Sequence, residues 1–499
     1  MIGNNVAINN SNQNFNQLAP LFASPTPSDI ERNFQKSWLD PARCENAVIG
    51  AANHIQLKLT ETKSIIASSC ATGGKTIEEL SKHSQRSPYY YHRDFLKTIE
   101  SAADIAGKNN YNITCPALFW MQGEQNYLSR QPGLITATDN TTDKAAYKDL
   151  MLTLKNDMQK DVMTAYQQTR KPLFITYQVG GKYIVGFEQN IGMAQLEAAN
   201  VEKDIVCAGP VYVMSDRNAG HLDANGYRWF GEMLGKVFYK TCIQGENFTP
   251  LQPAKISKLD EKTLRIDYLV PVKPLVIDTL LVNKELNLGF VVKNNTIEQE
   301  IESIHLEENG ETVTIKCKDD LTGDIEIAYA GANVLGHGNL RDSDPYQAFF
   351  NYVDLDGKDD KGNYIFEHDA ANTSLHPRYE PRDSNGVIYN KPYPLYNFSL
   401  HFYYKLPAGT TELIPPGLTG ETANSEINDR NNNRRLIYLS DNEIEITGNW
   451  HQAGFYDLSG RLCFETRNTG FINTATLKPG LFLINVEYNS ERMTFKYLR

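Results

Sequence analysis

The sequence contains no long apolar run and no clustered set of metal ligands. None of its apolar stretches approaches the ~18–20 residues that a membrane-spanning helix needs. Its seven cysteines are scattered, without a CxxC pair or a histidine spacing that would hold zinc. We therefore expect no membrane span, no metal ion and no cofactor.

Basic residues are also too few for a nucleic-acid partner. The chain has 49 Lys and Arg against 60 Asp and Glu, a formal charge of -11 at pH 7. Binding to phosphate backbones needs a clustered basic excess, which is missing here. A neutral or polar substrate fits this composition better.

The first residues lack the features of a signal peptide. The stretch "MIGNNVAINNSNQNFNQ" is rich in Asn and has neither a charged start nor an apolar stretch after it. We expect no signal peptide in the chain as given, and one explanation is that the N-terminus is incomplete.

Strands and helices alternate over roughly the first half of the chain. The predicted strands are 63–69, 115–122, 172–179 and 204–209, and the predicted helices are 94–107, 147–166, 191–200 and 225–239. Strands separated by helices of this length imply right-handed crossovers and a parallel sheet covered on both faces. Residues 1–245 are therefore predicted to form an α/β/α sandwich.

The remaining residues divide into three predicted parts. Short β-rich runs over 246–335 predict a β-sandwich accessory domain. Residues 336–424 are rich in Asp, Asn, Gly, Pro and Tyr, which favours a loop-rich extension. Residues 425–499 again alternate as β-strands and predict a C-terminal β-sandwich.

Three polar stretches follow predicted strands of the α/β part. They are "SSCATGGKTIEEL" from Ser68, "WMQGEQN" from Trp120 and "SDRNAGHLDANGYRWFGEML" from Ser215. Open parallel sheets bind ligands at the carboxyl ends of their strands, where all three stretches lie. Together they favour an acyl-transfer site.

Each stretch offers a group that such a site needs. His221 has a near-neutral pKa in free solution and suits the general base. The Gly74 N–H and the Gln122 amide suit donors to an oxyanion. Glu124 suits a carboxylate that fixes the loop or orients His221. Each stretch also has an ordinary structural explanation. His221 could be a solvated histidine in a loop, Gly74 could belong to a turn that leads into a helix, and the stretch from Trp120 could be a core strand that ends in polar residues.

These stretches resemble conserved blocks of the SGNH hydrolases, in the branch of sialate O-acetylesterases and related carbohydrate acetylesterases. The resemblance covers about residues 47–239. It implies a flavodoxin-like α/β/α fold, a serine nucleophile, a histidine base and no metal, with an acylated carbohydrate as substrate. It assigns His221 as base, Gly74 and Gln122 as oxyanion donors, and Glu124 as a supporting carboxylate.

The nucleophile of that family has no counterpart in the pattern. The family's serine belongs to a Gly-x-Ser element on the first strand, and no glycine-flanked serine follows an apolar strand among the candidates Ser11, Ser24, Ser28 and Ser37. We therefore expect the sheet to lack its first strand. Three explanations stay open: an incomplete N-terminus, a loss of catalysis, or Ser69 as the nucleophile on its own strand-to-helix turn.

The carboxylate partner of the histidine departs from the family pattern as well. The family usually has an Asp three residues before its histidine, and that position is Asn218 here. Asp216 is the nearest alternative. Without a carboxylate the histidine would be less well oriented.

The end of the chain carries a second resemblance. The stretches "YDLSGR" and "LKPGLFLINV" resemble the C-terminal sorting domain of the Bacteroidetes type IX secretion system. That resemblance implies export machinery as a partner and a secreted or cell-surface location, and the alternative is a plain Ig-like module. The combined prediction is an exported carbohydrate esterase. The alternatives are an inactive glycan-binding relative and a structural surface protein.

Overall fold

The structure is a computed structural model. It describes residues 6–9, 23–24, 47–59, 65–87, 89–128, 141–216, 220–363, 380–419, 436–440, 443–446, 450–457, 460–467, 472–474, 476–478, 481–488 and 492–498. The chain divides into two compact units, Met1–Gly420 and Glu421–Arg499. The division lies close to the predicted boundary at residue 425.

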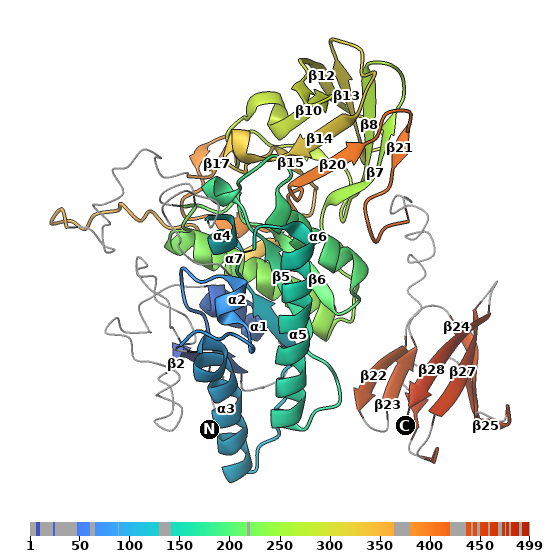
Figure 1. The fold of residues 1–499 in the computed structure, drawn as a ribbon. Helices are drawn as coiled ribbons and strands as arrows, with labels where there is room; N and C mark the ends of the chain where they lie inside the picture. The colour runs from blue at the N-terminus through green and yellow to red at the C-terminus, as the bar shows by residue number, and fades with distance from the viewer. Residues whose placement is uncertain are drawn as a thin grey trace. The chain divides into compact units, whose positions relative to one another are not determined.

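Six parallel strands form the centre of the α/β part, in two groups of three (Figure 1). The first group has the order β2-β1-β3 and the second the order β4-β5-β6. Their bounds are β1 (Val6–Asn9), β2 (Ala23–Ser24), β3 (Ile65–Ser68), β4 (Ala117–Trp120), β5 (Leu173–Gln178) and β6 (Ile205–Pro210). The predicted α/β class with parallel strands is confirmed.

The prediction that the first strand is missing is wrong. β1 pairs in parallel with β3 from Val6 opposite Ile65 to Asn9 opposite Ser68, and β2 pairs on its other side. The strand is only four residues long and lies inside an Asn-rich stretch, so its apolar content does not distinguish it from a polar tail. Its hydrogen bonds come from strands on both sides, which local sequence does not reveal.

Seven helices of the described residues accompany these strands. They are α1 (Ala47–Lys58), α2 (Ile77–Leu80), α3 (Lys97–Lys108), α4 (Glu124–Leu128), α5 (Lys144–Tyr166), α6 (Asn190–Val201) and α7 (Ala224–Phe238). Two π-helical turns, η2 (Tyr91–Leu96) and η4 (Tyr239–Ile243), adjoin α3 and α7, and a 3-10 turn, η3 (Gly181–Tyr183), follows β5. No helix among them is both long and apolar enough to cross a membrane.

Helix α1 was not predicted, and it packs directly on α7. Glycines make the close approach possible, because a Cβ on Gly231 would lie 2.5 Å from the Ala47 carbonyl oxygen. Further along, a Cβ on Gly235 would lie 2.5 Å from the Cβ of His54. The pair therefore depends on small residues at the contact.

The β-sandwich has two antiparallel sheets, of order β11-β10-β14-β20 and β12-β13-β8-β7-β21. Their strands are β7 (Gln252–Lys258), β8 (Thr263–Leu269), β10 (Phe290–Asn294), β11 (Ile297–Glu298), β12 (Ile301–Leu306), β13 (Thr312–Cys317), β14 (Ile325–Tyr329), β20 (Phe402–Leu406) and β21 (Glu412–Leu413). β20 and β21 lie within the range predicted to be a loop-rich extension. The predicted domain end at residue 335 is therefore too early, because both sheets are completed after it.

Short strand pairs and single turns occupy the rest of this unit. The pairs are β9 (Val276–Ile277) with β15 (Leu340–Arg341), β16 (Gln347–Asn351) with β19 (Pro392–Pro394), and β17 (Arg382–Asp383) with β18 (Gly386–Val387). The 3-10 turns are η5 (Leu286–Gly289) and η6 (Ala332–Val334).

The second unit contains two antiparallel sheets, β22-β23-β26 and β25-β24-β27-β28. Their strands are β22 (Leu436–Ser440), β23 (Glu443–Ile446), β24 (Trp450–Tyr456), β25 (Leu462–Arg467), β26 (Ile472–Asn473), β27 (Leu481–Tyr488) and β28 (Arg492–Leu498). Buried side chains, among them Trp450, Phe455 and Ile484, form its core. The second unit thus has two antiparallel sheets with a shared apolar core, and its assignment as a sandwich domain stays a prediction.

His401 lies fully buried where the β-sandwich meets the α/β part. Its Nε2 is 2.7 Å from the Val179 carbonyl oxygen, and its Nδ1 is 2.5 Å from Oε1 of Gln189. Two acceptors favour a protonated ring, but burial opposes the charge. Burial dominates and lowers the pKa of His401 to about 4.

This histidine should make the fold sensitive to acid. In the unfolded chain its pKa is about 6.5, so between that value and about 4 the unfolded state binds a proton that the folded state does not. Stability is then lost as the pH falls through this range. In urea titrations, the stability advantage of wild type over His401→Gln should shrink by about 3 kcal/mol between about pH 7.5 and about pH 4. An advantage that does not change with pH would contradict this assignment.

Candidate active site

The loop after β3 begins with a buried serine and ends at a capped helix. Ser69 follows the strand directly and is 9% exposed. Gly74 has a φ of +68° and is exposed, with open space where a Cβ would lie. Thr76 then caps α2 in a capping box with Glu79. The loop therefore turns at Gly74 and is fixed by the helix that follows it.

Gln122, at the end of β4, joins this loop to the next one. Its Nε2 donates to the Lys75 carbonyl oxygen at 3.1 Å and to Oδ1 of Asn126 at 2.7 Å, and its Oε1 accepts from the Tyr147 hydroxyl at 2.7 Å. Both amide hydrogens are thus used within the protein. The side chain holds the residue after Gly74, and its predicted donation to an oxyanion would require giving up one of these bonds. That role stays a prediction.

Asn126 connects the same two loops and was not predicted as a site residue. Its Oδ1 accepts from the Ile77 N–H at 3.0 Å, and its Nδ2 donates to Glu78 at 3.1 Å and to the Thr141 carbonyl at 3.0 Å. The side chain is fully buried. Its position four residues after Gln122, on the first turn of α4, is the sequence signal that would have identified it.

Gly123 and Glu124 make the turn between β4 and α4. Gly123 has a φ of +155°, and a Cβ there would meet the side chains of Ile191, Gln195 and Val179 at 3.1–3.2 Å. Only glycine suits a position that is both strained and crowded.

Glu124 accepts a short hydrogen bond from the buried hydroxyl of Tyr177 on β5. Burial raises the pKa of Glu124, and the Tyr177 bond opposes that shift. Of the two predicted roles of Glu124, this contact supports fixing the loop.

His221 lies exposed in the loop before α7, against a buried tyrosine. The Tyr183 hydroxyl is 3.1 Å from Nε2 and 3.2 Å from Nδ1, and the two rings meet edge to face at 5.7 Å. Tyr183 belongs to η3, which packs on α4, the helix that begins at Glu124. Tyr183 could not be identified from sequence patterns, because it lies on a different loop.

Asp216 is buried at the start of the same loop, and its backbone bridges to Leu222, next to His221. Its charge acts on Lys182: burial lowers the pKa of Lys182, and Asp216 opposes that shift. Asn218 lies outside the described residues. The backbone bridge therefore holds Asp216 near His221 within this loop, and the role of Asp216 as partner of His221 stays a prediction.

The candidate residues gather at one edge of the parallel strands. Their loops follow β3, β4, β5 and β6, and bonds join the Gly74 loop to Gln122 and His221 to Tyr183. Serine candidates Ser11, Ser28 and Ser37 lie outside the described residues, and Ser24 ends β2. Among the described residues no group of His, Cys, Asp and Glu is arranged to hold a metal.

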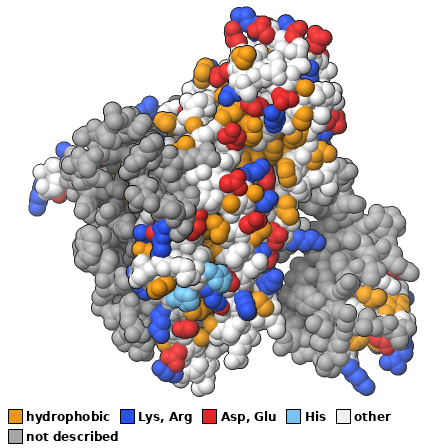
Figure 2. Space-filling model, viewed as in Figure 1, with side chains coloured by type: hydrophobic (Ala, Val, Ile, Leu, Met, Phe, Trp, Pro, Cys, Tyr) orange, Lys and Arg blue, Asp and Glu red, His pale blue; other side chains and the backbone are white. Residues whose placement is uncertain are grey.

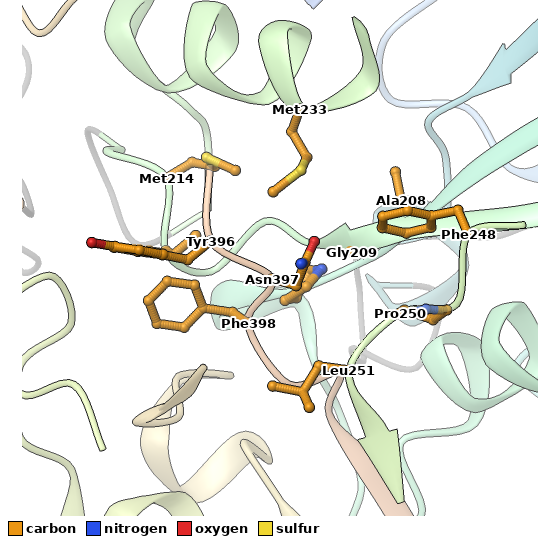
Figure 3. Close-up of a pocket in the computed structure, with 12 residues that line it drawn as sticks. Ala208, Gly209, Met214, Met233, Phe248, Pro250, Leu251, Tyr396, Asn397 and Phe398 are labelled. Carbon is orange, nitrogen blue, oxygen red and sulfur yellow. The ribbon is translucent and has the colours of Figure 1, made fainter. Parts of the chain in front are cut away.

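The face in view carries mixed charge, and the pocket between β6 and α7 is small. Acidic and basic side chains are interspersed over the face in view in Figure 2. A cavity of about 10 Å³ lies between β6, α7 and residues 396–398, with Met233 pointing towards that segment (Figure 3). It has room for about one water molecule, so it cannot hold a sugar.

Comparison with protein families supports an esterase. Residues 48–240 match the family model described as carbohydrate esterase, sialic acid-specific acetylesterase. The match covers less than half of the 499 residues. It contains every loop described above and supports the carbohydrate esterase branch of the predicted resemblance. No curated protein matches the chain.

Solved structures give more distant similarities. XAC1771, described as a novel carbohydrate acetylesterase from Xanthomonas citri, is 12% identical with a TM-score of 0.42, and the alignment covers 59% of this chain and 61% of that one. The S-layer protein rSbsC is 14% identical with a TM-score of 0.16, over 56% and 44% of the two chains. The pullulanase SAP of Group B Streptococcus is 11% identical with a TM-score of 0.12, over 50% and 23%. The chain thus spans less than two thirds of each of them.

Proposed function

We propose that the α/β part hydrolyses acyl esters, acetyl esters above all, on carbohydrates by a serine–histidine mechanism. The observation that carries the proposal is the family match over residues 48–240. The site supports it, because His221 stands exposed against Tyr183 at the edge where the Gly74 loop and Gln122 also lie.

The chemistry assigns His221 four proton transfers, one acceptance and one donation in each half of the reaction. A serine Oγ attacks the acyl carbon and gives its proton to His221, and the sugar alcohol takes that proton as the carbon–oxygen bond breaks. Water then attacks the acyl-enzyme, gives a proton to His221 and releases the acid, and the serine recovers the proton. The Gly74 N–H is the backbone donor assigned to the oxyanion in both steps.

Strand β1 supports Ser11 as the nucleophile. β1 runs parallel to β3, so both strands end at the edge that carries the site. Ser11 follows the last residue of β1, Asn9, by two positions in the sequence. Ser69, the predicted alternative, is 9% exposed directly after β3. In this proposal a serine after the first strand supplies the attacking oxygen.

Two serine variants separate these assignments. Ser11→Ala should lower kcat for 4-nitrophenyl acetate by at least about 10³-fold, since nothing else supplies the attacking oxygen. Ser69→Ala should keep at least half of the activity. The reverse result would make Ser69 the nucleophile. A wild-type protein that binds acetylated glycans in a pull-down but hydrolyses none would favour the inactive glycan-binding alternative.

The second unit fits an export role in this proposal. Its two antiparallel sheets suit the sorting domain that its sequence resembles, and recognition by the secretion machinery would place the esterase outside the cell or on its surface. Fractionation of cells that express the chain with and without residues 421–499 tests this location. Equal export of both chains would refute it.

A further inference from the structure

The buried ring of Tyr183 supports the exposed ring of His221. Tyr183 is 6% exposed, while His221 faces solvent. Gly220 brings the two together, because a Cβ on it would lie 2.5 Å from a Tyr183 ring carbon. The tyrosine is thus a fixed surface with a hydroxyl placed at the ring nitrogens of the proposed base.

The loop that carries this tyrosine is held at both ends by the β-sandwich. It spans residues 179–189, between β5 and α6. At its start, His401 lies 2.7 Å from the Val179 carbonyl oxygen. At its end, the Gln189 amide donates at 3.2 Å to two carbonyl oxygens of the β-sandwich, those of Tyr329 and Phe402. Both ends of the loop therefore depend on a different module.

Close backbone contacts reinforce these bonds. Gly336 has a φ of +76°, and a Cβ on it would lie 2.6 Å from the Gly181 nitrogen, at the first residue of η3. A Cβ on Gly192 would lie 1.9 Å from Cε1 of His401. Side chains are excluded at both positions, so the two modules touch through the backbone and the imidazole.

The loop that carries His221 meets the same part of the β-sandwich. Tyr212, in that loop, donates its hydroxyl hydrogen to the Ser399 carbonyl oxygen at 2.7 Å. Its ring packs edge to face on Phe398 at 6.0 Å. The cavity of about 10 Å³ nearby leaves little room for adjustment (Figure 3). Residues 398–402 therefore contact both the loop that carries His221 and the loop that carries Tyr183.

We propose that the β-sandwich positions the catalytic histidine: His401 fixes the 179–189 loop, and Tyr183 on that loop orients His221. Neither residue touches the reacting atoms, so both are positioning residues. The proposal rests on the proposed esterase function for its kinetic consequence. The structural part of the proposal, the dependence of the 179–189 loop on His401, does not require any activity.

Kinetic measurements test whether Tyr183 orients His221. Tyr183→Phe removes only the hydroxyl and keeps the ring packing. It should lower kcat for 4-nitrophenyl acetate by about tenfold or more with KM within twofold, because misalignment of the base slows proton transfer and leaves binding unchanged. The matched control is Tyr404→Phe on β20, whose buried hydroxyl has no hydrogen-bond partner among the described residues, and its kcat should not change. An unchanged kcat in Tyr183→Phe would overturn the orienting role.

Hydrogen exchange, measured on the full-length protein, tests whether His401 fixes the 179–189 loop. His401→Gln should speed amide exchange in peptides covering residues 179–189 by about tenfold or more, while peptides from α5 keep wild-type rates. Tyr404→Phe should leave all of these rates unchanged. Wild-type exchange of residues 179–189 in His401→Gln would overturn the coupling.

The kinetic and exchange measurements distinguish a failure of the loop coupling from a failure of the proposed esterase function. A wild-type chain without esterase activity would refute the proposed function, and the exchange rates would then decide the coupling alone. If His401→Gln unfolds, Gly336→Ala replaces it, since that Cβ presses on Gly181 from the same module. Unchanged exchange there would refute the coupling equally.

Discussion

Replacing His221 by alanine should lower kcat for 4-nitrophenyl acetate by at least about 10³-fold, without loss of folded protein. The imidazole is the proposed acceptor of the serine proton, and removal of such a base costs several orders of magnitude in serine hydrolases. The side chain is exposed, so its loss leaves no cavity. Initial rates measured over a range of substrate concentrations give kcat and KM separately.

His83 offers the matched control for this experiment. Its side chain is 68% exposed and pairs with Asp157 of α5 at 3.0 Å. His83→Ala should keep the wild-type rate. A His221→Ala variant that also keeps it would show that His221 is not the base, whatever the nucleophile is.

Replacing Lys236 by alanine should cost about 3–5 kcal/mol of unfolding free energy, the largest stability effect that we expect. Lys236 is fully buried on α7, and its Nζ lies 2.8 Å from Asp344 and 2.6 Å from the Leu395 carbonyl oxygen. Burial lowers the pKa of Lys236, and Asp344 opposes that shift. Without the lysine, the buried carboxylate of Asp344 keeps its desolvation cost and loses its nearer counter-charge, while Lys240 stays at 3.9 Å.

Urea unfolding, followed by tryptophan fluorescence, measures this loss. Two compact units can unfold separately, so the transition of the first unit must be assigned with a chain that ends at residue 420. Lys108→Ala is the control, because Lys108 pairs with Asp104 on an exposed face of α3 and should leave the midpoint nearly unchanged. Equal midpoints for the two variants would contradict the prediction.

The strands and helices of the α/β part were largely predictable because their apolar residues follow clear periods. The predicted helix 147–166 lies within α5, and the predicted strand 172–179 contains β5. β1 and α1 were missed for different reasons. β1 is a short strand in an Asn-rich stretch, and α1 gains its stability from glycine contacts with α7 that appear only after folding.

The site was predictable only as far as single loops allow. Gln122, Glu124 and His221 could be selected because each follows a predicted strand. The partners of these residues could not, since Tyr177, Tyr183 and Tyr147 belong to other elements that reach them in space. The same limit applies to residues 402–413, which read as loop-rich sequence and yet complete both sheets of the sandwich.

Strand β1 also matters for any fragment cut from this chain, because it pairs with β3. The family match begins at residue 48, but β3 receives its parallel partner from residues 6–9. A fragment cut to residues 48–240 would leave β3 with an unpaired edge and would strip His401 from the loop after β5. Open edges pair with other chains, so this fragment would gain a route to aggregation while losing contacts that support the candidate site. The region that matches the esterase family model is therefore smaller than the region that builds the sheet of the candidate site.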